Sequence, residues 1–99
     1  MRLSLQTRQI IRDTVKDVFG PNASVMLFGS RVDDTARGGD IDLLVQSEKI
    51  VFDRERKALQ LVAKLQMQLG DQPIDVLVLD PQVPCLPVHE EAIRTGVRL

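Results

Sequence analysis

The sequence predicts an α/β (α+β) domain in which a small mixed β-sheet is flanked by helices. Amphipathic stretches with helical spacing alternate with short apolar runs, which is typical of this fold class. Their order is helix, strand, strand, helix, strand, helix, which favours a sheet covered by helices. The chain has 99 residues, of which 43% are hydrophobic, and this suffices for one modest core. We therefore expect residues 1–99 to form a single domain.

A helix and a strand are predicted first along the chain. Ser4 is suited to cap the N-terminus of the helix, and Gly20 followed by proline ends it. Between them the apolar side chains recur at helical spacing, at Ile11, Val15 and Val18. An apolar strand over residues 24–28 follows and stops abruptly at a glycine.

The second strand, predicted over residues 40–46, begins with two acidic residues. Alternate side chains of a strand point to the same face, so Asp40 and Asp42 should project together. Two adjacent carboxylates repel each other, and a cation between them removes that repulsion. Hard oxygen ligands select Mg²⁺, Mn²⁺ or Ca²⁺ over zinc.

The second half of the chain predicts a long helix, a third strand and a short last helix. Asp53 is expected to cap the long helix, which should reach Leu69 and stop at Gly70. Prolines within residues 81–87 are expected to keep the next loop extended, and His89 is expected to start the last helix at the surface. The remaining elements are expected over residues 74–79, 89–95 and 97–99.

Asp75 stands inside the apolar third strand. A lone carboxylate in such a strand is costly unless it is paired, solvated or bound to a metal. If the second and third strands are neighbours, Asp75 joins Asp40 and Asp42. Three convergent carboxylates are suited to hold two divalent ions, an arrangement used in phosphoryl and nucleotidyl transfer.

Gly29 and Ser30, at the end of the first strand, are candidates for holding a triphosphate. Glycine allows the backbone to approach a phosphate closely, and the serine hydroxyl adds a hydrogen-bond donor. Arg31 or Arg37 would add positive charge, and spacing does not decide between them; we take Arg31, which adjoins Ser30, as the candidate.

Together these motifs resemble those of a known family. Phe28-Gly29-Ser30, then Gly39-Asp40-Ile41-Asp42-Leu43, then Asp75 are similar to the motifs of polymerase-β-type nucleotidyltransferases. Within that superfamily the chain most resembles the minimal nucleotidyltransferases of bacteria and archaea. The resemblance implies a polymerase-β-like fold, ATP as the substrate and two Mg²⁺ ions. It also implies that Asp40, Asp42 and Asp75 are the catalytic metal ligands and that Gly29 and Ser30 contact phosphate.

The same resemblance implies a partner. Minimal nucleotidyltransferases often act with a helical HEPN-domain protein as a toxin–antitoxin pair, in which the nucleotidyltransferase is the antitoxin and attaches AMP to a tyrosine of the toxin. We expect that function here. The alternative is a catalytically idle nucleotide-binding antitoxin or subunit that neutralises its partner by contact. Departures from the common motif favour it mildly, because Val32-Asp33-Asp34 replaces Ala-Arg-Gly and Gly39 replaces a serine.

Composition disfavours several other function classes. A net charge of −1 and an aromatic share of 3% provide little for direct binding of nucleic acid. The chain has one cysteine, which excludes an internal disulfide framework. It has neither a secretory signal nor an apolar run long enough to span a membrane, so the expected compartment is the cytoplasm.

Overall fold

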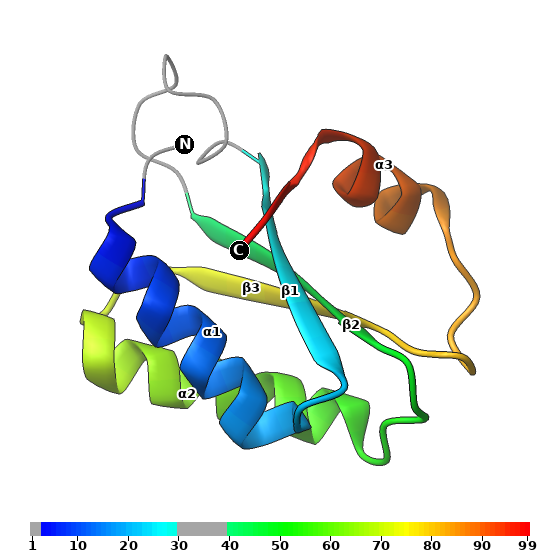
Figure 1. Cartoon of the computed structure of the whole chain (residues 1–99), viewed down its shortest axis with the longest axis horizontal. Coiled ribbons are helices and arrows are strands. Elements are labelled where there is room, and N and C mark those ends of the chain that lie inside the picture. Colours follow the sequence, from blue (N-terminus) through cyan, green and yellow to red (C-terminus); the bar gives the residue numbers. More distant parts are fainter. Residues whose placement is uncertain (1–2, 30–39) are drawn as a thin grey trace.

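The computed structural model of the chain describes residues 3–29 and 40–99 (Figure 1). Helices and strands follow one another in the predicted order, and the third strand has the predicted bounds. The second strand begins one residue later than predicted, so that Asp40 precedes it. The elements are α1 (Leu5–Phe19), β1 (Ala23–Phe28), β2 (Ile41–Ser47), α2 (Arg54–Leu69), β3 (Ile74–Leu79), α3 (Pro87–Thr95) and β4 (Val97–Arg98).

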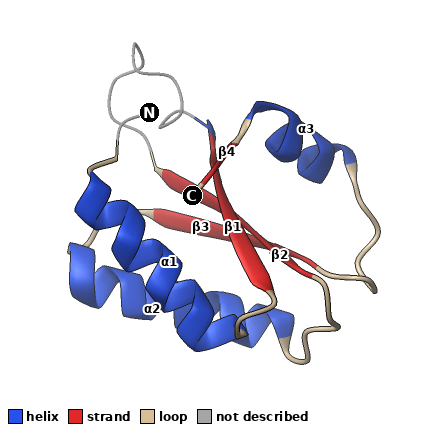
Figure 2. Cartoon of the chain, viewed as in Figure 1, coloured by secondary structure: helices blue, strands red, loops and turns tan. Residues whose placement is uncertain are grey.

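The four strands form one mixed sheet with the order β3-β2-β1-β4 (Figure 2). Strand β1 runs antiparallel to both β2 and β4, whereas β2 and β3 are parallel. The connection from β2 to β3 passes through α2, as a parallel pair requires. The predicted fold class, with its mixed sheet and flanking helices, is therefore confirmed.

Helices α1 and α2 cover one face of the sheet and enclose the main core. Ile41, Leu43 and Val45 of β2 alternate along the strand and are almost completely buried on this face. The core consists of Ile11, Val15, Val25, Leu27, Ile41, Leu43, Val45, Leu61, Leu65 and Ile74. Because these side chains come from two helices and three strands, burying them fixes how β2 lies between β1 and β3.

The opposite face of the sheet is partly covered by α3. Leu44 points away from the main core yet is 0% exposed. Its cross-strand neighbour Met26 reaches towards Gly96 at the end of α3, and Ala92 of that helix is buried as well. Asp42 and Asp75 belong to this face by strand alternation. Asp75 is exposed and Asp42 is half-buried, so this part of the face is not covered by α3.

The helix ends confirm some predicted caps and correct others. The Ser4 hydroxyl accepts a hydrogen bond from the Thr7 amide at 3.1 Å, as an N-cap should. Asp53 does precede α2, but its side chain makes no capping bond. The backbone at Asp53 adopts the left-handed region, with φ 56°, where an N-cap normally has extended backbone. The prediction of a side-chain cap there was wrong.

The start of α3 also differs from the prediction. The helix begins at Pro87, two residues earlier than predicted, because proline is well accommodated in the first turn of a helix. His89 was expected at the surface but is only 6% exposed. Its Nδ1 accepts a hydrogen bond from the Leu86 amide at 3.0 Å, which satisfies a free N–H at the helix start.

Within residues 3–29 and 40–99 we find no helix with the length and hydrophobicity needed to cross a membrane.

A candidate nucleotidyl-transfer site

The parallel pairing of β2 with β3 brings two of the predicted carboxylates together. Asp42 and Asp75 are register partners. Neighbouring strands lie about 4.8 Å apart, and register partners project from the same face. Asp40 directly precedes β2, at the same end of the sheet. The second and third strands are neighbours, which was the condition for Asp75 to join the other two aspartates, and Asp75 lies beside Asp42.

Negative charge is concentrated at this end of the sheet. Partial burial raises the pKa of the Asp42 carboxyl group, and repulsion from Asp75 and then from Asp40 raises it further. Asp42 is half-buried, whereas Asp40 and Asp75 are exposed. The ionised form of Asp42 is therefore disfavoured in the protein alone, and a cation near these carboxylates would favour it.

Gly29 packs directly against Asp42. It follows Phe28, the antiparallel register partner of Asp42, so β1 ends beside the carboxylates. Its φ is +77°, a conformation that favours glycine. A β-carbon at this position would collide with the Asp42 carboxylate oxygen Oδ2. The absence of a side chain at Gly29 therefore makes room for the Asp42 side chain.

The other predicted nucleotide-contact residues, Ser30 and Arg31, lie outside the described residues, as does Arg37. The structure brings Gly29, the first residue of the Gly-Ser motif, to the Asp42 carboxylate.

The donor chemistry of the site suits a hard cation, because every candidate ligand is a carboxylate oxygen. Repulsion from Asp75 and from Asp40 raises the pKa of Asp42, so the three carboxylates lie close enough to interact. Over residues 3–29 and 40–99, however, no three acidic, histidine or cysteine side chains lie close enough together to hold a metal ion as they stand. The backbone thus brings Asp42 and Asp75 to register positions on one face, with Asp40 at the same end of the sheet.

Sequence reasoning missed Asp80, the residue that follows β3. Its side chain is fully buried, and its Oδ2 accepts hydrogen bonds from the Val51 amide at 2.7 Å and from the Arg54 guanidinium at 3.1 Å. Its Oδ1 accepts from the amides of Gln82 and Val83 at 2.9 and 3.1 Å. These bonds hold the end of β3 to the start of α2. The available signal was an aspartate followed by proline at a strand end, a common turn-forming pair.

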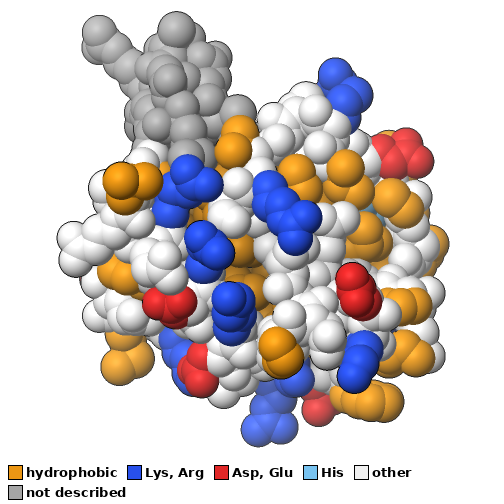
Figure 3. All heavy atoms as spheres, in the orientation of Figure 1, with side chains coloured by type: hydrophobic (Ala, Val, Ile, Leu, Met, Phe, Trp, Pro, Cys, Tyr) orange, Lys and Arg blue, Asp and Glu red, His pale blue; other side chains and the backbone are white. Residues whose placement is uncertain are grey.

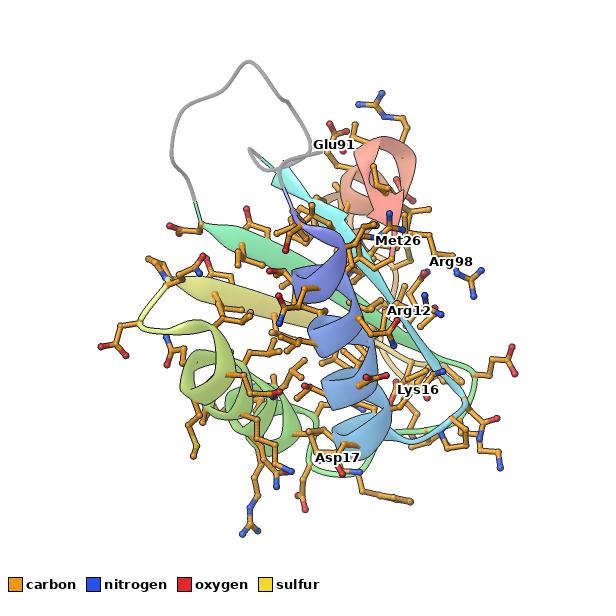
Figure 4. All side chains as sticks on the ribbon, turned by 60° about the vertical axis from the view of Figure 1, so that its left-hand side comes forward. Arg12, Lys16, Asp17, Met26, Glu91 and Arg98 are labelled. Atoms are coloured by element: carbon orange, nitrogen blue, oxygen red, sulfur yellow. The ribbon has the colours of Figure 1, made fainter. Side chains whose placement is uncertain are left out.

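A basic hollow lies at the other end of β1. It has a volume of about 240 Å³, and Arg12 and Lys16 of α1 line it together with Arg98 of β4 (Figure 4). In the space-filling view several Lys and Arg side chains lie over this side of the molecule (Figure 3). Ser24 also lines the hollow and is the register partner of Gln46. The hollow therefore lies at the opposite end of β1 from Phe28, the partner of Asp42. A cluster of basic side chains therefore lies apart from the carboxylates of the candidate site.

A family model matches most of the chain. Residues 11–99 match the model described as "Polymerase beta, Nucleotidyltransferase". The match includes all the predicted site residues, from Gly29 to Asp75. A search of curated proteins found none that matches this chain.

Solved structures of toxin–antitoxin complexes share the fold. A mutant of the toxin–antitoxin MntA-HpeT is 23% identical, with a TM-score of 0.70 over 97% of this chain and 72% of the other. A toxin–antitoxin with AMP-PNP is 23% identical, with a TM-score of 0.67 over 95% and 72%. The tri-AMPylated Shewanella oneidensis HEPN toxin in complex with MNT antitoxin gives 22% identity and a TM-score of 0.62 over 95% and 68%. At these identities the likeness shows a shared fold.

Proposed function

Because the chain belongs to the polymerase beta nucleotidyltransferase family, we propose that it transfers AMP from ATP to a hydroxyl group of a partner protein. The observation that carries the proposal is the register of β2 and β3, which sets Asp75 opposite Asp42 beside the glycine that ends β1. The proposed partner is a helical HEPN-domain toxin with an acceptor tyrosine, and the chain is its cytoplasmic antitoxin. Two similar structures, an AMPylated HEPN toxin with its antitoxin and a complex with AMP-PNP, support this choice.

The proposed site uses carboxylates and backbone. Asp40, Asp42 and Asp75 would hold two Mg²⁺ ions after their side chains turn inwards. When bound, Mg²⁺ neutralises phosphate charge and lowers the pKa of the attacking hydroxyl. Gly29 and Ser30, with Arg31, would hold the triphosphate at the end of β1.

The reaction is a displacement at the α-phosphorus of ATP. The acceptor oxygen forms a bond to that phosphorus, the bond to the β-phosphate oxygen breaks, and pyrophosphate leaves. The acceptor proton passes to the Asp75 carboxylate and then to water. Asp75 suits this role because it is exposed, while its neighbour Asp42 is half-buried.

A transfer assay with two labels tests the proposal. The chain is incubated with Mg²⁺, ATP and the protein encoded by the neighbouring gene, the proposed HEPN-domain partner. Label at the α-phosphate should appear on the partner, and label at the γ-phosphate should not. Asp42→Asn, which preserves shape and removes charge, should reduce transfer at least about 100-fold, since a metal supplies several kcal/mol of transition-state stabilisation. Asp71→Asn, at an exposed position after α2, is the matched control and should transfer normally.

The assay also separates the contact-only alternative. If the Asp42→Asn protein transfers no AMP but still neutralises the toxin in cells, contact is the mechanism. Transfer from the γ-labelled position, or full transfer by the Asp42→Asn protein, would contradict nucleotidyl transfer at this site.

A further inference from the structure

Strand β3 is an open edge of the sheet. It is the first strand in the order β3-β2-β1-β4, and among the described residues it pairs only with β2. The Ile41 amide donates to the Pro73 carbonyl at 3.0 Å, which fixes the phase of the parallel ladder. In such a ladder the backbone N–H and C=O groups of alternate residues point to the neighbouring strand, so those of Asp75 and Leu77 point to β2. The backbone N–H and C=O groups of Ile74, Val76 and Val78 therefore face outwards, and none of them has a backbone partner in the described part of the chain.

A groove runs along this edge. It has a volume of about 370 Å³, and the three successive residues Val76, Leu77 and Val78 all line it. Successive side chains point to opposite faces, so a hollow that touches three of them lies beside the strand. Arg54, Glu55 and Ala58 of α2 form one flank. Gln82, Val83, Pro84 and His89 form the opposite flank.

The groove is suited to an extended peptide. An exposed row of backbone donors and acceptors is a template for another strand. Val76, Val78, Val83 and Pro84 give the groove apolar surface for alternate side chains of that strand. Nucleic acid fits poorly, because the one cationic side chain in the lining, Arg54, is already paired with Asp80.

The groove continues directly into the candidate site. Asp75 immediately precedes Val76, and Asp42 lies across from Asp75 on the same face. A strand added to β3 would place its residue opposite Asp75 on that face too, about 4.8 Å away in the hydrogen-bonding direction. A side chain at that position would be held beside the carboxylates.

We propose that the acceptor protein docks by adding an extended segment to the open edge of β3, with its hydroxyl-bearing residue opposite Asp75. This rests on the proposed function for the identity of the occupant, which is a segment of the HEPN-domain partner. The groove along Val76–Val78 binds the neighbouring apolar residues of that segment, and the outward backbone groups fix its register.

Amide hydrogen exchange, measured by NMR, tests the docking directly. In the free protein the outward amides of Val76 and Val78 should exchange fast, and the inward amides of Leu77 and Leu79 should exchange slowly. On addition of the purified HEPN-domain protein, exchange at Val76 and Val78 should slow at least about tenfold. Unchanged exchange there in the complex, or no binding of this protein, overturns the proposal.

A proline substitution supplies a second measurement. Val78→Pro removes an outward N–H and leaves the β2 ladder intact, as proline is tolerated on edge strands. It should raise the KM for the protein acceptor at least about tenfold and leave binding of Mg²⁺ and AMP-PNP unchanged. Val78→Ala shortens the side chain but retains the backbone N–H, so it shows how much of the change in KM comes from lost side-chain packing.

The outcomes separate the two proposals. An unchanged acceptor KM in a folded Val78→Pro protein overturns strand addition and leaves AMP transfer standing. Protection of Val76 and Val78 without any transfer supports the docking mode and contradicts the activity. Protection in the free protein that increases with its concentration assigns the edge to a second copy of the chain and overturns the proposed occupant.

Discussion

At the residue scale, Gly29 and Asp42 form the most closely fitted pair in the site. The left-handed backbone at Gly29 and the lack of a side chain there allow the Asp42 carboxylate to lie against the end of β1. Asp42 in turn carries an electrostatic strain from partial burial and from its acidic neighbours. Groups with a perturbed pKa are concentrated at functional sites, so the raised pKa of Asp42 supports the proposed nucleotidyl-transfer site.

Replacement of Gly29 by alanine should impair both folding and transfer. The new β-carbon meets Asp42, and the positive φ adds a backbone penalty of about 1–2 kcal/mol. Gly70→Ala is the matched control, because Gly70 also has positive φ, +92°, but has nothing within 4 Å of the added carbon. Thermal unfolding should show a larger loss for Gly29→Ala than for Gly70→Ala. Equal decreases in Tm for the two variants would show that the contact between the new β-carbon and Asp42 does not destabilise the fold.

Asp42→Asn should stabilise the metal-free protein while abolishing transfer. The pKa of Asp42 is raised, so the folded state holds this proton more tightly than the unfolded state does, and ionising the group at neutral pH weakens the fold. The variant should therefore have a higher Tm than the wild type without Mg²⁺. Mg²⁺ with AMP-PNP should raise the Tm of the wild type and have little effect on the variant. A lower Tm for the variant without metal would contradict this account.

At the element scale, the buried Asp80 connects the end of β3 to the segment that leads into α2. Its carboxylate accepts hydrogen bonds from three backbone amides and from Arg54. A buried carboxylate remains ionised when it has this many donors. The same contacts form one end of the groove beside β3, since Arg54 and Gln82 both line it.

The stability due to Asp80 should depend on pH. Hydrogen bonds from the Val51 and Gln82 amides and from Arg54 lower the pKa of Asp80. A lowered folded-state pKa gives stability that is fully present above the ordinary aspartate value of about 3.9 and is lost as the pH falls through the lowered value. Asp80→Asn should lower the Tm by several degrees at pH 7, because its amide group meets the Val51 and Arg54 donors. This deficit should shrink below about pH 4.

Thermal unfolding of both proteins from pH 7 to pH 2 measures this dependence. Glu48→Gln, at an exposed position, controls for the loss of one negative charge. A deficit that is constant across this range would assign the effect of Asp80→Asn to packing.

At the scale of the whole molecule, β2 is the centre of the structure. It is bonded on both edges, to β1 and β3, and Leu43, Leu44 and Val45 are each 0% exposed. Leu43 and Val45 belong to the core under α1 and α2, whereas Leu44 points to the opposite face of the sheet. The acidic site is at one end of this strand, and the basic hollow lies beside the other end of β1.

Native-state hydrogen exchange should reflect this organisation. The amides of Leu43–Val45 should exchange most slowly, through global unfolding, and β4 should exchange fast, because it pairs only with Met26 and Leu27. Rising denaturant should accelerate exchange in β2 with the slope of global unfolding. Exchange in β2 as fast as in β4 would contradict a single cooperative core around β2.

The sequence by itself determined the local features. The Ser4 cap, the end of α2 at Gly70 and the bounds of β3 follow from residue propensities and hydrophobic periodicity, which depend on near neighbours along the chain. The Asp-x-Asp pair and Gly29 were predicted to lie together, and the structure brings Gly29 to Asp42. The resemblance to a family suggested the chemistry of this site, which stays a prediction.

Only the tertiary structure decided which residues meet across the sheet. The register that sets Asp42 opposite Asp75, the burial of Asp80 and His89, and the open edge of β3 all depend on how distant segments pack. The left-handed backbone at Asp53, where the expected cap does not form, lies at the turn into α2. These features escape the sequence because hydrogen bonds and buried contacts between strands form between residues that are far apart in the chain.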